Sequence, residues 1–514
     1  MDVFFLVVAW AVGLAVKLIK LPTLVGYLVA GLLLAALGFK ADATLKQIGD
    51  LGVMFLLFTL GLHIRLQNVL RIEVLGVGGL HLLVSAMIYS GVLLLLGFTG
   101  TSALLMAIGL GFSSTVLTAK ALESRDELDS YHGRLAIGIL ILQDLVAVAL
   151  LAFTGSATPT LWALCLIGLP LLRPALLYFL RLTDHDDLLL LFGVLLAVGG
   201  GAMFELVGLD AKLGALVAGI LLAGDTKADE LSKRLWGIKE LFLIGFFLLV
   251  GLAGFPEPSG VLTALVLLAL LPLKAVCFFG LFMIFRLRAR TGFMTSLALA
   301  AYSEFALIVA TAGAASGVVP TEVVLAIALL VVLSYALNAY ANQKANRLWL
   351  RLESWLVRWE RAEVEHPDKQ PESIGSAAYI VVGMGRAGAA AYDYLVEHGE
   401  RPLGFEADPN RLAENLQAGR RVHFADAQDP ELWRHLNLDQ VQGVLLAVPN
   451  LKAKLRSARL LREEGYRGAI RALVREEADD VALREEGIQA VGVPLVEAGK
   501  EMAELSLQET PVPA

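Results

Sequence analysis

The chain has 514 residues, of which 57% are hydrophobic and only 18% are charged, and its mean hydropathy is +0.70. This composition is too apolar for a soluble protein of that length, so it predicts an integral membrane protein. The net charge of −7 offers no basic surface for a nucleic acid, so no nucleic-acid partner is expected. Both cysteines lie in apolar runs without metal-site or redox spacing, so neither a disulfide nor a zinc site is expected.

Apolar windows long enough to cross a bilayer, about 20 residues each, recur from the first residues to about Asn342. No basic leader or small-residue cleavage site accompanies the first window, which is therefore expected to be a retained helix. We count thirteen windows, centred near Ala11, Leu28, Phe55, Ser85, Gly111, Leu142, Leu169, Ala197, Leu216, Phe246, Ala275, Leu307 and Leu329.

Basic residues alternate between the gaps that separate these windows. The even-numbered gaps are poor in Lys and Arg, whereas the odd-numbered gaps hold Lys17, Lys20, Arg65, Arg71, Lys120, Arg125, Arg134, Arg173, Arg181, Lys227, Lys233, Arg234, Lys239, Arg286, Arg288 and Arg290. Short cytoplasmic loops are enriched in Lys and Arg. The pattern therefore predicts an external N-terminus, a cytoplasmic C-terminus and thirteen spans rather than twelve.

The sixth window, residues 133–152, carries Gln143 and Asp144 at its middle. A carboxylate at mid-membrane costs about 2.5 to 3.5 kcal/mol on insertion scales, so it normally faces a water-filled cavity or a partner. We interpret Asp144 as a site for which a proton and a cation compete, against the alternative of an acid held in a structural hydrogen-bond network. Gln143 either coordinates the cation or its water, or satisfies backbone groups where helices cross.

Three hydroxyl residues, Ser113, Ser114 and Thr115, interrupt the fifth window. They offer oxygen ligands to a dehydrated cation and relief for backbone groups where a helix unwinds. In membrane helices such small polar residues are more often packing contacts, but their clustering favours the ion site.

Two further charged residues lie in the later windows. Lys274 is too deep in the window 261–285 to reach the membrane surface. It either competes with the cation for Asp144 or stabilises the C-terminal ends of broken helices. Glu304 either lines the cation path or lies near the membrane edge as a bridge to a basic group, and we favour the second.

Beyond Asn342 arginines alternate with tryptophans, which predicts a helix lying at the cytoplasmic interface, and a polar stretch with Pro367 and Pro371 follows. We therefore divide the chain into a transmembrane domain (1–343), an interfacial helix with a linker (344–376) and a soluble domain (377–514).

The soluble domain opens with a predicted strand, the glycines Gly383, Gly385 and Gly388 in GxGxxG spacing, and a helix over 389–398. A second strand over 402–406 ends in Glu406, placed for a ribose hydroxyl. Further strands at 421–424, 443–448 and 469–474 predict a parallel, doubly wound Rossmann-like sheet. The phosphates of AMP or NAD(H) would lie on the turn formed by Gly383, Met384, Gly385, Arg386, Ala387 and Gly388, and Asp426 would approach the adenine or the sugar.

The sequence lacks the features that two competing functional classes require. A dehydrogenase requires a substrate domain, for which the C-terminal segment leaves no room, so the chain is not expected to be an enzyme. A potassium channel requires a carbonyl filter such as TVGYG, which the sequence lacks.

The chain resembles the Kef-type cation:proton antiporters of the monovalent cation:proton antiporter-2 family, which carry a cytosolic nucleotide-binding (RCK/TrkA-N) domain. The resemblance covers nearly the whole chain and is carried by residues 25–31, 111–115, 142–145, 213–219, 245–251, Lys274, 303–305 and the Gly383 turn. It implies an NhaA-like inverted repeat in which two interrupted helices cross, here at 111–118 and 301–307. Gln143 and Asp144 would occupy the ion site, and Lys274 would be the family's intramembrane lysine.

The resemblance also implies a function: efflux of K⁺, or alternatively of Na⁺, in exchange for protons by a homodimer embedded in the lipid of a bacterial inner membrane. A nucleotide-gated cation channel is the remaining alternative. The chain departs from the family at 61–64, where His63 replaces an acid. Its C-terminal domain is shorter than in glutathione-gated members, and no set of glutathione-binding residues can be placed.

Overall fold

The computed structural model describes residues 3–19, 21–63, 72–125, 127–128, 130–154, 160–183, 186–209, 211–360, 369, 371, 373–474 and 477–491. It divides into two compact units. The first unit is helical and comprises Met1–Ala121, Leu135–Phe285 and Phe293–Leu352. The second comprises Leu122–Arg134, Arg286–Gly292 and Glu353–Ala514.

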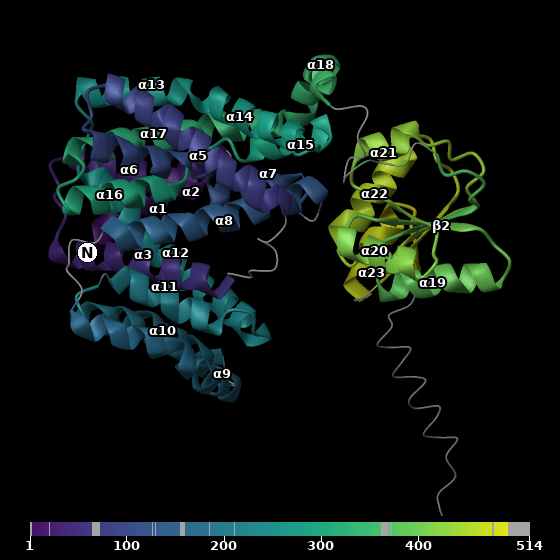
Figure 1. The fold of residues 1–514 in the computed structure, drawn as a ribbon, viewed down its shortest axis with the longest axis horizontal. Coiled ribbons are helices and arrows are strands. Elements are labelled where there is room, and N and C mark those ends of the chain that lie inside the picture. Colours follow the sequence, from purple (N-terminus) through teal and green to yellow (C-terminus); the bar gives the residue numbers. More distant parts are fainter. Residues whose placement is uncertain are drawn as a thin grey trace, which may run out of the picture. The chain divides into compact units, whose positions relative to one another are not determined.

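The first unit consists mainly of helices, most of them apolar, and many of these run side by side (Figure 1). They are α1 (Val3–Leu18), α2 (Thr23–Ala36), α3 (Ala43–His63), α5 (Ile72–Leu95), α6 (Gly100–Gly111), α7 (Thr115–Ser124), α8 (Tyr131–Thr154), η1 (Leu161–Leu172), α9 (Arg173–Leu182), α10 (Asp186–Leu206), α11 (Ala211–Leu222), α12 (Thr226–Leu252), α13 (Pro258–Ala269), α14 (Leu271–Ile284), α15 (Ala289–Ala298), α16 (Glu304–Ala315), α17 (Thr321–Gln343) and α18 (Ala345–Leu356).

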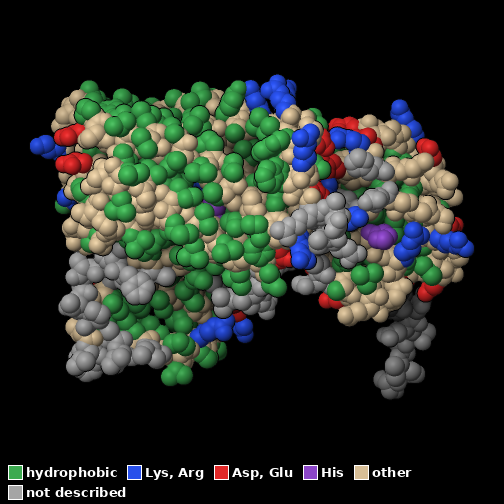
Figure 2. Space-filling model, turned by 45° about the horizontal axis from the view of Figure 1, so that its top comes forward, with side chains coloured by type: hydrophobic (Ala, Val, Ile, Leu, Met, Phe, Trp, Pro, Cys, Tyr) green, Lys and Arg blue, Asp and Glu red, His purple; other side chains and the backbone are tan. Residues whose placement is uncertain are grey.

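The centre of every predicted window falls on one of these helices. Within the described residues six helical stretches, one of which is α13 together with α14, are long and apolar enough to cross a membrane, and five more helices are apolar but shorter. Apolar side chains cover much of the face of this unit that Figure 2 shows. Large apolar side chains such as Trp10, Met87 and Leu95 are 68%, 68% and 90% exposed, as expected for a surface that contacts lipid rather than water. The number of spans stays a prediction.

Glycines bring several of these helices into backbone contact. A Cβ on Gly31 of α2 would lie 2.5 Å from the Leu248 carbonyl oxygen of α12, and a Cβ on Gly61 of α3 would lie 2.5 Å from the Leu216 oxygen of α11. Such close approach is the usual means of helix association in lipid, where apolar side chains gain nothing by leaving the hydrocarbon.

Proline interrupts two of the predicted windows. The window near Leu169 consists of the 3₁₀ helix η1, which contains Pro170, followed by α9, with a proline in its first turn. The window 261–285 is divided at Leu270, just before Pro272, into α13 and α14. Proline lacks the N–H that an uninterrupted α-helix needs.

The second unit is built on a six-stranded parallel sheet with the order β3-β2-β1-β4-β5-β6. Its strands are β1 (Tyr379–Val382), β2 (Pro402–Glu406), β3 (Val422–Phe424), β4 (Gly443–Leu446), β5 (Ala469–Leu473) and β6 (Gln489–Val491). Helices α19 (Arg386–Glu397), α20 (Pro409–Gln417), α21 (Pro430–His435), α22 (Leu451–Glu463) and α23 (Glu477–Glu485) lie around it (Figure 1). The predicted doubly wound sheet is confirmed; β6 was not predicted.

Candidate functional site

Two helices of the first unit are interrupted and cross each other. After α6 the chain is extended from Phe112 to Ser114, and α7 then begins; after α15 it is non-helical until α16 begins at Glu304. The extended strands form an antiparallel bridge between Ser113 and Tyr302, and the Ser114 N–H donates to the Ala301 oxygen at 3.3 Å. These are the two predicted interruptions. Unwinding frees backbone groups that need partners inside the protein.

Gln143 on α8 supplies two of those partners. Its side-chain oxygen accepts from the Ser113 N–H at 2.8 Å, and its amide nitrogen donates to the Gly111 oxygen at 3.5 Å. The side chain is fully buried. Of the two predicted roles, these bonds favour backbone satisfaction over direct cation coordination.

Asp144, the next residue, is 4% exposed and faces the start of α7. Among the described residues the Thr115 hydroxyl alone donates to its carboxylate, at 3.4 Å. The Ser113 hydroxyl is also buried and has no described hydrogen-bond partner. The crossing thus brings together a buried carboxylate with spare acceptor capacity and a hydroxyl oxygen that no described group uses.

Glu304 is the second acid of the crossing. It is 5% exposed, its Oε2 accepts from the Tyr335 hydroxyl at 2.8 Å, and the Ser114 hydroxyl donates to it at 3.1 Å. The interpretation that we favoured, a bridge near the membrane edge, is therefore wrong, because α16 begins inside the protein and its first residue lies at the crossing.

Lys274 of α14 caps the ends of both broken helices. Its ammonium donates to the carbonyl oxygens of Phe112 at 2.6 Å, Ala301 at 3.3 Å and Leu110 at 3.4 Å. No ion pair joins Lys274 and Asp144 within the described residues. The geometry matches the predicted role at helix C-termini, where partial negative charge accumulates.

Several buried polar residues near the crossing were missed by sequence reasoning. Tyr302 donates to the Leu267 oxygen at 2.7 Å and lies 3.0 Å from the Tyr89 hydroxyl. His81 of α5 is fully buried, with its ring stacked on Phe278 and its Nε2 3.2 Å from the Ser85 hydroxyl. A signal existed for His81, because an ionisable residue in the middle of an apolar window is rare. The tyrosines carried none, since a tyrosine is unremarkable in an apolar run.

Lys212, in the first turn of α11, pairs with Asp50 of α3 at 3.6 Å. His63 is the last residue of α3, and its side chain lies outside the described part of the chain.

In the second unit, the predicted glycine turn connects β1 to α19. Gly383 has φ +87°, and a Cβ on Gly388 would lie 1.9 Å from the Gly383 oxygen, so these two glycines allow the turn and the close packing of helix on strand. A Cβ on Gly385 would meet only a side-chain nitrogen of Arg411, at 3.8 Å, which leaves space beside the first turn of α19. The three positions fit a pyrophosphate held at a helix N-terminus.

The other residues of the turn differ in how far their side chains are exposed. Arg386 and Ala387, in the first turn of α19, are exposed, whereas the Met384 side chain is buried in an apolar cluster. Arg386 and Ala387 are thus accessible to a phosphate group, and Met384 is available through its backbone.

Both predicted sugar-binding acids accept backbone hydrogen bonds. Glu406, at the end of β2, accepts from the N–H groups of Met384 at 2.9 Å and Asp408 at 2.8 Å. Asp426, after β3, accepts from the N–H groups of Gln428 at 3.0 Å and Tyr131 at 2.8 Å. The carboxyl ends of β2 and β3 therefore place both acids at the edge of the sheet where nucleotides bind in such folds.

Segment Leu122–Arg134, which belongs to the second unit, contacts the same sheet edge. Besides the Tyr131–Asp426 bond, the Arg134 guanidinium donates to the Ala407 oxygen at 2.6 Å, and the Tyr131 ring packs edge-on against Phe424 at 5.2 Å between centroids. Segment Arg286–Gly292 contributes Arg288 and Arg290, which each lie 3.0 Å from an oxygen of Asp429. Neither set of contacts was predicted.

Comparisons with known proteins agree with this arrangement. The family model for the transmembrane part of sodium/hydrogen exchangers matches residues 3–340, and that for the TrkA-N domain matches residues 379–494. The first match covers well over half of the chain. The chain therefore belongs to the sodium/hydrogen exchanger family: it is a cation/proton antiporter with a TrkA-N domain, and not an enzyme.

Individual relatives are similar over most of their length. The glutathione-regulated potassium-efflux system protein KefC of Cronobacter sakazakii is 27% identical over 530 residues, which cover 98% of this chain and 83% of that protein. The putative cation/proton antiporter YbaL of Escherichia coli is 27% identical over 492 residues, covering 87% and 86%. The sodium proton antiporter MjNhaP1 of Methanocaldococcus jannaschii has a structure that covers 68% of this chain and 97% of its own, with a TM-score of 0.47 and 16% identity.

Proposed function

We propose that the chain exchanges potassium ions for protons, with potassium leaving the cell, and that Asp144 binds the two ions in turn. The observation that carries the proposal is the environment of this carboxylate: it is 4% exposed and has one described hydrogen-bond donor, the Thr115 hydroxyl at 3.4 Å. A buried carboxylate with so few partners requires a compensating positive charge, which a proton or a monovalent cation supplies.

The neighbouring oxygens support a site that binds one ion at a time. The hydroxyls of Ser113 and Thr115 are of the kind that replaces water around a dehydrated cation, and Glu304 adds a second carboxylate to the crossing. With both acids charged, the site attracts a cation; a proton on Asp144 removes that attraction and releases the cation. The preference for potassium over sodium rests on the relative named as a potassium-efflux protein.

The test is cation-driven proton movement in proteoliposomes that contain the full-length protein. We expect Asp144→Asn to abolish exchange, because an amide takes up no proton and carries no charge to exchange. The matched control is Asp187→Asn, which removes the same charge from an exposed position at the start of α10. An Asp144→Asn protein that exchanges as well as the wild type would exclude Asp144 as the ion site.

The same vesicles separate the competing functions. A sodium gradient that moves protons where a potassium gradient does not would identify a sodium/proton antiporter. Potassium flux that moves no protons in either direction would identify a channel.

We further propose that the second unit binds AMP or NAD(H) and regulates the exchanger through it. The support is the space beside Gly385 at the N-terminus of α19, together with Glu406 and Asp426 at the neighbouring strand ends. The Tyr131 N–H that bonds Asp426 belongs to the first turn of α8, the helix that also carries Asp144.

Calorimetry with AMP and with NADH on the full-length protein tests the nucleotide proposal. We expect Gly385→Asp to weaken binding at least tenfold, because the new carboxylate occupies the space for the phosphate and repels it. Ala390→Asp is the control, since it adds the same charge to an exposed position one turn further along α19. Equal affinities in the two variants would argue against a nucleotide at this turn.

A further inference from the structure

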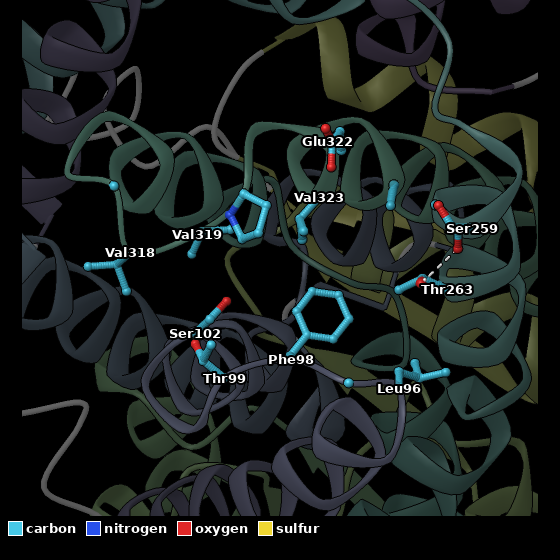
Figure 3. Close-up of a pocket in the computed structure, with 15 residues that line it drawn as sticks. Leu96, Phe98, Thr99, Ser102, Ser259, Thr263, Val318, Val319, Glu322 and Val323 are labelled. Atoms are coloured by element: carbon cyan, nitrogen blue, oxygen red, sulfur yellow. Dashed lines mark hydrogen bonds between the residues drawn. The ribbon is translucent and has the colours of Figure 1, made fainter.

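A cavity of about 530 Å³ lies within the first unit, at the end of α6 away from the crossing (Figure 3). Residues before and within the first turns of α6, α13 and α17 line it. Because α6 has 12 residues and rises about 1.5 Å per residue, roughly 18 Å of helix separates the cavity from the crossing. The cavity is therefore a different site from Asp144, and it takes no part in the proposed ion exchange.

Three helix N-termini meet at this cavity. The N-cap residues of α6, α13 and α17 are Thr99, Glu257 and Pro320, and none of them makes a side-chain capping hydrogen bond. The first N–H groups of an α-helix have no partner within the helix, and they carry a partial positive charge. Three such ends at one cavity provide a setting for a phosphate or another oxyanion.

Ser102 supplies an independent indication of a ligand. This residue of the first turns of α6 is 1% exposed, and its hydroxyl has no hydrogen-bond partner among the described residues. Figure 3 shows the hydroxyl directed into the cavity. By contrast, the Thr263 hydroxyl is satisfied by the Ser259 carbonyl oxygen at 2.9 Å. A buried hydroxyl without a partner costs free energy, so it points to an acceptor that occupies the cavity.

The charge of the lining selects among oxyanions. Glu322 is the sole ionisable residue among the fifteen that line the cavity, and Figure 3 places it across the cavity from Ser102. A ligand carrying only negative charge would face this carboxylate unpaired. A zwitterion that combines a phosphate with an ammonium group satisfies both sides.

The apolar part of the lining indicates how such a ligand is attached. Leu96, Phe98 and Val318 line the cavity, and Leu94 and Leu95, directly before Leu96, are 51% and 90% exposed on the apolar surface of the unit. A lipid whose acyl chains lie on this surface can therefore place its headgroup in the cavity. We propose that the cavity binds the headgroup of a phosphatidylethanolamine-type phospholipid, with its phosphate at the helix N-termini and Ser102 and its ammonium group at Glu322.

Native mass spectrometry of the delipidated full-length protein tests this site, with phosphatidylethanolamine and phosphatidylglycerol added separately. We expect the wild type to bind phosphatidylethanolamine at least tenfold more tightly, because phosphatidylglycerol has the phosphate but no ammonium group. Glu322→Gln should bring the affinity ratio close to one. Ser102→Ala should weaken binding of both lipids by about tenfold, the loss expected for one hydrogen bond to a charged group.

Matched controls are available. Thr101→Ala and Glu205→Gln change exposed residues that do not line the cavity and should leave both affinities unchanged. Thermal unfolding of each lipid-free variant checks that the fold is intact. Equal binding of the two lipids by the wild type, or a Ser102→Ala protein that binds like its Thr101→Ala control, would overturn the proposal.

Two soluble probes distinguish the source of the headgroup. Free phosphoethanolamine that competes as strongly as the lipid would overturn the lipid assignment in favour of a soluble zwitterion. Inorganic phosphate that competes equally well in wild type and Glu322→Gln would overturn the zwitterion.

Discussion

Ser113 and Ser114 are adjacent in the sequence but differ in what their hydroxyls contact. The Ser113 hydroxyl is buried without a described partner, whereas the Ser114 hydroxyl lies 3.1 Å from Glu304 and 2.8 Å from the Tyr335 hydroxyl. The extended backbone at the crossing causes this difference, because successive side chains of an extended chain point in opposite directions.

The two serines should therefore respond differently to removal of the hydroxyl. We expect Ser113→Ala to raise the KM for the cation several-fold without lowering the melting temperature, since no internal hydrogen bond is lost. Ser114→Ala should lower the free energy of unfolding by roughly 1 kcal/mol or more, because Glu304 and Tyr335 lose a partner. Cation titration of exchange in proteoliposomes and thermal unfolding in detergent measure the two effects.

Each serine serves as the control for the other. A Ser113→Ala protein with an unchanged KM would exclude its hydroxyl as a cation ligand. Equal loss of stability in both variants would contradict the separation of their roles.

Individual residues of the ion site differed in how far the sequence revealed them. Asp144 was recognisable because an acid in a long apolar window has an unavoidable desolvation cost. The role of Glu304 was missed although the resemblance implied an interruption over 301–307, because only the start of α16 at Glu304 shows that this acid lies at a helix end inside the protein. Such a position depends on where the helix breaks, which a hydropathy pattern does not encode.

At the scale of elements, Lys274 holds two broken helices together. It is 2% exposed and donates to carbonyl oxygens that follow the ends of both α6 and α15, the closest being Phe112 O at 2.6 Å. A cation at these ends is stabilised by the partial negative charge of both helices. The crossing thus depends on a residue from a third helix, α14.

We expect Lys274→Met to destabilise the first unit by roughly 1 to 3 kcal/mol, because buried carbonyl oxygens are left without a donor. Thermal unfolding in detergent measures the loss. Lys212→Met is the control, since Lys212 is partly exposed and pairs with an exposed Asp50. An unchanged melting temperature together with a tighter apparent cation affinity would instead support direct competition between Lys274 and the cation.

Elements of the second unit followed closely from the sequence. The strand predicted over 402–406 coincides with β2, and the predicted strands at 443–448 and 469–474 contain β4 and β5. Short apolar runs bounded by turn residues carry this information locally. The strand β6 has three residues, Gln489–Val491, and its pairing with β5 is a tertiary contact that so short a run does not predict.

At the scale of the whole molecule, the second unit includes two segments that lie far from its sheet in the sequence. Glu127 of segment Leu122–Arg134 is 2% exposed and lies within 3.1 Å of Arg125, His132 and Arg456. Burial acts against the charge of its carboxylate, but hydrogen bonding to His132 and the nearby positive charges outweigh burial and lower its pKa from 4.5 to about 2. Arg456 on α22 thereby attaches the segment to the sheet domain.

The lowered pKa of Glu127 predicts how the attachment of segment Leu122–Arg134 to the sheet domain depends on pH. A carboxylate whose pKa is lowered in the folded state contributes stability that is complete above pH 4.5 and is lost as the pH falls toward about 2. The full contribution is at most roughly 3 kcal/mol, from about 1.4 kcal/mol for each pH unit. Glu127→Gln should therefore speed hydrogen exchange of the peptide that contains Tyr131 at about pH 6, and the difference from wild type should shrink at about pH 3.

Comparison of the two proteins at the same pH removes the intrinsic pH dependence of hydrogen exchange. Glu464→Gln, which changes a partly exposed acid 3.9 Å from Arg434, should show no such difference at either pH. An exchange difference between wild type and Glu127→Gln that stays constant from pH 6 to pH 3 would contradict the prediction.

The assembly of the whole protein into a homodimer stays a prediction.

By itself, the sequence determined that the chain is a polytopic membrane protein with a Rossmann-like domain and an acid, Asp144, in the middle of an apolar window. These features depend on local composition and on the cost of burying charge, whereas the interruptions near 111–118 and 301–307 were expected only from the resemblance to the antiporter family. Only the tertiary structure decided that Gln143 satisfies the unwound backbone, that Lys274 caps two helices, that Glu304 lies at the crossing, and that Asp426 accepts from Tyr131. Each of these is a contact between residues distant in the sequence, and its partner is set by the packing of the folded chain.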